Sequence, residues 1–239
     1  MNCWICGKIA NSREHKIKKS LLKNVFKEDF ENKNMRHVKE GQTTKLAGPN
    51  SNKVKFKQVI CEDCNNSKTQ AYDLSFDIFI DYIRQNYINI NKYRMINFKE
   101  VFGESFSIQQ TNLYKFFVKI LGCDLSEYGF NVPTDLIELL DKEIFKTKLI
   151  ITFSINEEII NSNFPINSKL GNGYLITTQN NLLTKKEIDT KYRFEIDLFY
   201  LRINFFYNCS TDIGTGSDWV SDKQYLYIGT SKDMNKNLI

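Results

Sequence analysis

The sequence predicts an α+β protein whose N-terminal part is braced by a metal ion. Two Cys-x2-Cys pairs stand near the start of the chain, apolar residues then recur at helical spacing as far as residue 145, and strand-like alternation follows from residue 147. The paired cysteines are Cys3, Cys6, Cys61 and Cys64. We expect an N-terminal core with structural zinc, followed by a mixed helical and antiparallel-sheet C-terminal region.

The N-terminal elements are expected to be short. Residues 8–12 fit the arm of a β-hairpin that leaves the first cysteine pair, and residues 16–26 have apolar side chains at roughly helical spacing. Residues 30–52 are polar, with turn signals in GQTT and AGPNSN. Residues 53–61 alternate apolar and polar side chains, which predicts a strand that leads into the second cysteine pair.

Helices and then strands are expected after the second cysteine pair. The helices are predicted within residues 65–87, 109–129 and 132–145, and the strands within 148–155, 173–179, 193–207 and 223–229. The stretch 90–105 reads as a connector. We therefore divide the chain into a domain over residues 1–95 and an α+β domain over residues 105–239.

Composition and charge narrow the functional class. Hydrophobic residues make up 41% and charged residues 26% of the 239, which is typical of a globular protein. The longest apolar stretch, LSFDIFIDYI, is interrupted by Asp77 and Asp81, so we expect no membrane span and a cytoplasmic location. Residues 1–70 hold 15 Lys and Arg against 7 Asp and Glu, so their net charge is +8. Such a patch favours a polyanionic partner; the alternative is a solvated basic surface.

The two cysteine pairs predict zinc. Each Cys-x2-Cys turn aims two thiolates at one point, and two such turns supply the four sulfurs of a closed, tetrahedral Zn²⁺ site. The 54 residues between Cys6 and Cys61 exceed the spacing of a plain zinc ribbon, so a subdomain is expected between the pairs. A redox role would need a thioredoxin-like βαβ context, which the sequence lacks. Cys123 and Cys209 are expected to be buried apolar thiols.

The order of these motifs resembles the HNH endonuclease family, with its zinc-braced ββα-metal core. The residues that carry the resemblance are Cys3, Cys6, Glu14, His15, Cys61, Cys64 and Asn65. They lie within residues 1–90 and are followed by a predicted helix. Each part is weak on its own, and the set is specific.

The resemblance implies a metal-dependent endonuclease that hydrolyses DNA phosphodiester bonds. His15 would be the general base that activates water, and Glu14 and Asn65 would hold a catalytic Mg²⁺ or Mn²⁺. In a simple pleat Glu14 and His15 face opposite ways, so both serve one ion only if the chain bends there. Seven lysines would contact the nucleic acid: Lys16, Lys18, Lys19, Lys53, Lys55, Lys57 and Lys68.

Each site residue also has a structural alternative. Glu14 can form a salt bridge to Arg13, Lys16 or Lys18, and Asn65 can cap a helix. His37 is expected at the surface or on a phosphate, and Asp73 either near the site or in solvent.

One position departs from the family pattern. An Asn that usually precedes the second cysteine pair is absent, and Gln58 or Asn52 would have to replace it.

The rival hypothesis is a non-catalytic, zinc-stapled adaptor that binds nucleic acid or a protein partner. Residues 105–239 carry no motif for a reaction, and an ATPase or sensor is the partner we expect for them. A nuclease of this type fits anti-phage defence. A ribonuclease or toxin with the same fold is a third hypothesis.

Overall fold

The computed structural model describes residues 1–32, 34–39, 41–162, 170–172, 175–178, 191–220 and 222–230, and it confirms the α+β class. The helices are α1 (Lys19–Val25), α2 (Lys27–Glu31), α3 (Gln70–Gln85), α4 (Tyr87–Tyr93), α5 (Phe98–Phe102), α6 (Phe106–Glu127), α7 (Thr134–Asp141) and α8 (Glu157–Ile160). Two 3₁₀ turns, η1 (Asn52–Val54) and η3 (Gly103–Ser105), and the π-helical turn η2 (Asp63–Lys68) complete the described helical segments.

The main sheet occupies the C-terminal half. Its described strands are β4 (Leu149–Ile155), β5 (Leu170–Asn172), β6 (Ile176–Thr178), β7 (Lys191–Leu198), β8 (Leu201–Asn208) and β10 (Gly229–Thr230). Their order is β10-β4-β8-β7-β5, with β6 also on β7, and all pairs are antiparallel except β10 with β4. Burial alternates along β7, as the sequence pattern predicts.

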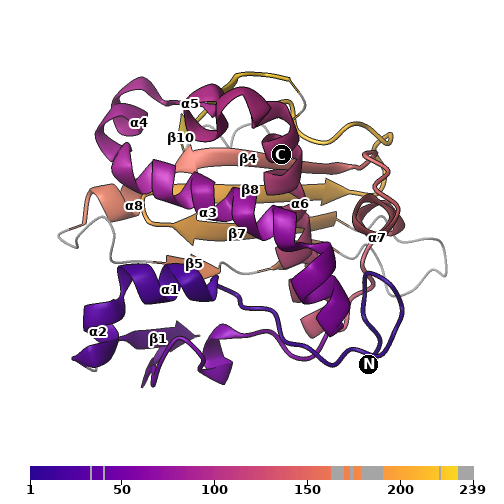
Figure 1. Ribbon diagram of the computed structural model, residues 1–239, viewed down its shortest axis with the longest axis horizontal. Helices are drawn as coiled ribbons and strands as arrows, with labels where there is room; N and C mark the ends of the chain where they lie inside the picture. The colour runs from indigo at the N-terminus through magenta and orange to yellow at the C-terminus, as the bar shows by residue number, and fades with distance from the viewer. Residues whose placement is uncertain are drawn as a thin grey trace.

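Helices α3 and α6 cover one face of this sheet (Figure 1). Phe79 of α3 and Phe117 of α6 both pack edge-on against Phe153 of β4, with ring centroids 5.9 and 6.0 Å apart. Phe117 also contacts Phe205 of β8. Both helices therefore have a common partner in the sheet. Helix α6 begins before the predicted range of 109–129 and ends at Glu127, two residues before its predicted end.

The N-terminal region lies beside α3 and near the β5 edge of the sheet (Figure 1). Segment 12–15 runs antiparallel to segment 55–60, joined by isolated bridges from Ser12 to Ile60 and from His15 to Lys55. The strands β1 (Arg36–Lys39) and β2 (Gln42–Lys45) form a separate two-stranded sheet between these segments. A helix follows the second cysteine pair, as predicted, but it begins with a π-helical turn.

Three local predictions were wrong or incomplete. The helix predicted over 16–26 is found as the shorter α1, and a second helix that was not predicted, α2, follows after Phe26. The predicted strand over 53–61 is a 3₁₀ turn followed by an extended segment with isolated bridges. Residues 30–52, predicted as polar turns, contain β1 and β2.

The predicted connector over 90–105 is regular structure. It contains α5, η3 and β3 (Met95–Asn97), and β3 pairs with β9 (Tyr225–Tyr227). Of the strand predicted over 173–179, residues 176–178 form β6, while 173, 174 and 179 lie outside the described residues.

Buried apolar residues from both predicted domains belong to one continuous cluster that includes Cys3, Phe79, Phe117 and Phe205. The division into residues 1–95 and 105–239 stays a prediction. No helix in the described part of the chain is long and apolar enough to cross a membrane.

Candidate metal centre and the surroundings of His15

The four paired cysteines converge on one point. The sulfurs of Cys3, Cys6, Cys61 and Cys64 all lie within 4.8 Å of one another, and Cys6 Sγ lies 3.6 Å from Cys61 Sγ. A tetrahedron with Zn–S bonds of about 2.3 Å has sulfurs about 3.8 Å apart, whereas a disulfide needs about 2.05 Å. All four thiols are free. The spacing therefore fits one tetrahedral ion.

Backbone hydrogen bonds shape both cysteine turns. The Cys3 amide donates to the Lys8 carbonyl, and the Gly7 amide donates to the Cys3 carbonyl over 2.8 Å. Gly7 has φ of 74°, a left-handed conformation that favours glycine. In the second turn the Asn65 amide donates to the Cys61 carbonyl over 2.9 Å. The backbone of the two turns thus holds the four cysteine side chains in place.

The donor set fits a structural metal such as zinc. Cys3, Cys61 and Cys64 are buried and Cys6 is half-buried, and burial raises the pKa of the Cys3 thiol. Several thiolates in so small a space need a cation to offset their charge. Among the described residues this is the group of His, Cys, Asp and Glu side chains that could hold a metal.

The first cysteine turn is docked on helix α6. The indole of Trp4 lies against Gly122, where an added Cβ would come within 2.4 Å of a ring carbon. Trp4 Nε1 also donates to Cys123 Sγ over 3.4 Å. Cys123 is completely buried, as expected, and Cys209 is half-buried. A metal bound here would therefore be fixed relative to the main core.

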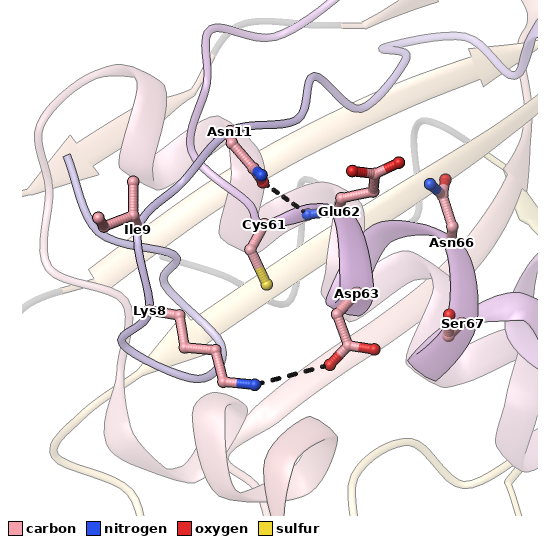
Figure 2. A pocket seen from close by; sticks show the side chains of 8 residues that line it. All are labelled: Lys8, Ile9, Asn11, Cys61, Glu62, Asp63, Asn66 and Ser67. Carbon is pink, nitrogen blue, oxygen red and sulfur yellow. Dashed lines mark hydrogen bonds and ion pairs between the residues drawn. The ribbon is translucent and has the colours of Figure 1, made fainter.

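A surface depression of about 630 Å³ lies beside the cysteine cluster (Figure 2). The Glu62 amide donates to Asn11 Oδ1 at one wall, and Lys8 lies 3.9 Å from Asp63 at the other. Neither Glu14 nor His15 lines this depression. It is therefore separate from the predicted catalytic residues.

Glu14 is engaged by a lysine that sequence reasoning missed. Lys119 on α6 is completely buried, and its Nζ lies 2.5 Å from Glu14 Oε2 and 3.2 Å from Asp73 Oδ2 on α3. The other Glu14 oxygen accepts the His15 backbone N–H over 2.8 Å. Burial acts to lower the pKa of Lys119, but Glu14 and Asp73 raise it above its ordinary value. Lys119 is therefore a charged group that holds both carboxylates.

His15 faces the segment before the second cysteine pair. It is half-buried, and Nε2 is buried without a hydrogen-bond partner. Burial lowers the pKa of His15, Lys55 and Lys19 lower it further, and Glu14 and a hydrogen bond with Pro49 oppose them. The imidazole is therefore neutral at pH 7 and can accept a proton at Nε2.

Asn65 lies on the other side of segment 12–15. Its Nδ2 donates to Ser12 Oγ over 3.0 Å, and its Oδ1 is buried without a partner. Ser12 contacts Asn65 of η2 and Glu14 contacts Lys119 of α6. Because side chains alternate along an extended chain, Arg13, which donates to Asn52, and His15, which bonds Pro49, face the opposite side. The structure does not bring His15 and Asn65 together.

A divalent ion shared by Glu14 and Asn65 does not fit this arrangement. Both Glu14 oxygens are already in use, and Asn65 offers one amide oxygen on its own. We therefore assign no step of a reaction to such an ion.

The predicted nucleic-acid lysines divide into two groups. Lys16, Lys18 and Lys68 pair with Glu127, Asp77 and Asp141 at 2.5–2.6 Å. The others form no ion pair among the described residues; they are Lys19, Lys53, Lys55 and Lys57. Lys19 and Lys55 are electrostatic neighbours of His15, and Lys53 is an electrostatic neighbour of His37. Lys19, Lys53 and Lys55 of this second group therefore place positive charge near the two histidines.

The fold and the cysteine cluster define an α+β protein with a candidate structural metal centre. Comparison of the chain with protein-family models, with curated proteins and with solved structures finds no match.

Proposed function

We propose that this protein is a zinc-braced nuclease that hydrolyses phosphodiester bonds, with His15 as the general base. One observation carries the proposal: Nε2 of the half-buried His15 has no hydrogen-bond partner, and Lys19 and Lys55 are electrostatic neighbours that, with burial, lower the pKa of the imidazole. A base of this kind typically contributes about 10²- to 10⁴-fold to the rate.

The proposed reaction needs three tasks from the chain. His15 Nε2 takes a proton from water as the water oxygen attacks phosphorus. Lys19 and Lys55 attract the phosphate and offset the negative charge that develops on it in the transition state. The P–O bond to the leaving group breaks, and the leaving oxygen takes a proton from solvent. Glu14 positions His15 by accepting its backbone N–H.

The test compares wild type with His15→Ala on supercoiled plasmid DNA and on single-stranded RNA, each with Mg²⁺, Mn²⁺ or EDTA. We expect cleavage by wild type and a rate at least about 100-fold lower for the variant. The rate should rise with pH through the lowered pKa of His15 and be level above pH 6.5, because only the neutral imidazole accepts a proton.

The control is Lys92→Ala, which removes an exposed charge on α4, away from His15, and should cleave like wild type. Equal zinc content in all three proteins shows that the frame is intact. Equal rates for wild type and His15→Ala would remove His15 from the chemistry. Absence of cleavage under every condition would reject the nuclease.

A second candidate is a non-catalytic, zinc-stapled adaptor for nucleic acid or for a protein partner such as an ATPase or sensor. It is favoured by the engagement of Glu14 with Lys119 and by the separation of His15 from Asn65. It predicts salt-dependent DNA binding without cleavage under any divalent ion.

A further inference from the structure

The hairpin of β1 and β2, described over residues 36–39 and 41–45, is a ribbon with almost no protein cover. Cross-strand pairs join Arg36 to Lys45, His37 to Thr44, Val38 to Thr43 and Lys39 to Gln42. All eight strand residues are exposed except His37, which is half-buried. An isolated two-stranded hairpin is marginally stable in water, so this ribbon needs support from its base.

A small hydrophobic cluster provides that support. Leu46, the residue after β2, is 3% exposed and packs with Leu22, Phe26 and Val54. The Leu46 amide donates to the Met35 carbonyl over 3.1 Å, which extends the ladder to the base of the ribbon. The ribbon is therefore anchored at one end and projects from the body at the other.

The two faces of the ribbon differ in their surroundings. His37 is directed to the body, since burial and then Lys53 and Lys16 lower its pKa. Alternation places Arg36 and Lys45 on the opposite, outward face, directly across from each other. Like charges in such a pair destabilise a sheet. The outward face therefore carries two cationic side chains next to each other.

The positive charge of the protein is concentrated in the part of the sequence that contains this ribbon. Residues 33–57 contain seven Lys and Arg and one acidic residue, a net charge of +6, although the whole chain carries +5. The remainder of the chain therefore has a net charge of −1. This segment is the part of the protein that attracts a polyanion.

We propose that the β1–β2 ribbon is a binding element for duplex DNA and enters the major groove. That groove is about 12 Å wide and admits a two-stranded ribbon. Arg36 and Lys45 on the outward face offer side chains of the types that bond base edges and phosphates, and Lys53 and Lys55 follow later in the chain. The inference rests on the proposed function and names its substrate class.

Two features favour B-form DNA over other nucleic acids. Single-strand binding relies on exposed aromatic side chains on which bases stack, and the aromatic residue in 33–57 is Phe56, which is completely buried. Duplex RNA has a deep and narrow major groove that side chains do not reach. The ribbon therefore lacks the aromatic surface that binds single strands, and it does not reach the bases of duplex RNA.

The test measures binding, not cleavage, so that it is independent of the nuclease proposal. The parent protein is His15→Ala, and its binding to a labelled 20-base-pair DNA duplex is followed by fluorescence anisotropy. The ribbon variant adds Arg36→Ala and Lys45→Ala to this parent, and the control variant adds Lys92→Ala and Lys142→Ala. We expect the ribbon variant to bind at least about 10-fold more weakly and its salt slope to fall by about 1.8, whereas the control stays within about 2-fold.

A second variant, Val38→Glu, places a negative charge on the same outward face at a side chain that is 65% exposed. It should weaken duplex binding by a similar factor and leave zinc content and circular dichroism unchanged. Duplex binding equal to that of the parent in both variants would overturn the proposal. Tighter binding of single-stranded DNA or of duplex RNA by the parent would also overturn it. Ribbon-dependent duplex binding, together with no cleavage by wild type, would reject the nuclease and leave the ribbon proposal standing.

Discussion

Replacement of Lys119 by methionine should be one of the most destabilising single changes in this protein. Methionine keeps most of the apolar stem and removes the ammonium group. The Glu14 carboxylate, with 11% of its side chain exposed, would then lose its cation. Asp73, with 23% exposed, would keep Lys18 as an electrostatic neighbour. The cost should therefore come mainly from Glu14.

The distances set the scale of this loss. With Nζ 2.5 Å from Glu14 and 3.2 Å from Asp73, each attraction is about 5–7 kcal/mol at an effective dielectric constant of about 20. Desolvation of the buried charges offsets much of that gain. Removal of one partner from a buried ion pair costs about 3–5 kcal/mol of unfolding free energy, which is the loss we expect for Lys119→Met.

The assay is urea unfolding followed by circular dichroism, with zinc present, and the matched control is Lys115→Met on the same helix. Lys115 is also buried, with 8% of its side chain exposed, but its partner Glu143 is 74% exposed and 3.8 Å away. Burial lowers the pKa of Lys115, whereas the carboxylates raise that of Lys119. The control should therefore cost less than about 1 kcal/mol.

A double variant shows whether the loss comes from Glu14. Glu14→Gln added to Lys119→Met removes the uncompensated charge and should restore at least about 1.5 kcal/mol. Equal costs for Lys119→Met and Lys115→Met would refute the buried ion pair, and so would a double variant no more stable than Lys119→Met.

Three further changes have measurable outcomes. Removal of the metal by a chelator should lower the thermal midpoint of unfolding. It should also shift the fluorescence of Trp4, because Trp4 follows Cys3 directly and packs on α6. Unchanged emission would contradict this packing. Gly122→Ala should destabilise the fold by about 1–3 kcal/mol, because the new Cβ overlaps the indole; a neutral effect on the urea midpoint would be inconsistent with the close approach. Burial raises the pKa of Asp124 to about 7, so its contribution to stability is present below pH 3.8 and is lost as the pH rises through 7. Asp124→Asn should flatten this pH dependence of the urea midpoint and stabilise the protein at pH 8; an unchanged profile would count against the raised pKa.

The sequence predicts best those elements whose pattern reflects one buried face. Helix α3 and strand β7 follow from apolar periodicity because each packs one side on a common core. The ribbon was missed because both of its faces are exposed, so it shows no alternation. Gly41, with φ of 76°, was the available signal, since it marks the turn between the strands.

The candidate site was predictable in its local part. Two Cys-x2-Cys turns were sufficient to predict the cysteine cluster because each turn is a local geometry. Lys119 was not identified, because its pairing with Glu14 joins distant segments that only the docking of the N-terminal region on α6 brings together. A signal was present: Lys115 and Lys119 lie four residues apart within an otherwise apolar helical stretch.

The central claim is that the four cysteines hold one ion and so fix the segment that carries Glu14 and His15. X-ray absorption at the zinc edge of the purified protein tests it most directly. The account predicts one zinc per chain, surrounded by four sulfurs at about 2.3 Å. A protein that purifies without tightly bound metal, or a first shell that contains nitrogen or oxygen in place of sulfur, would contradict it.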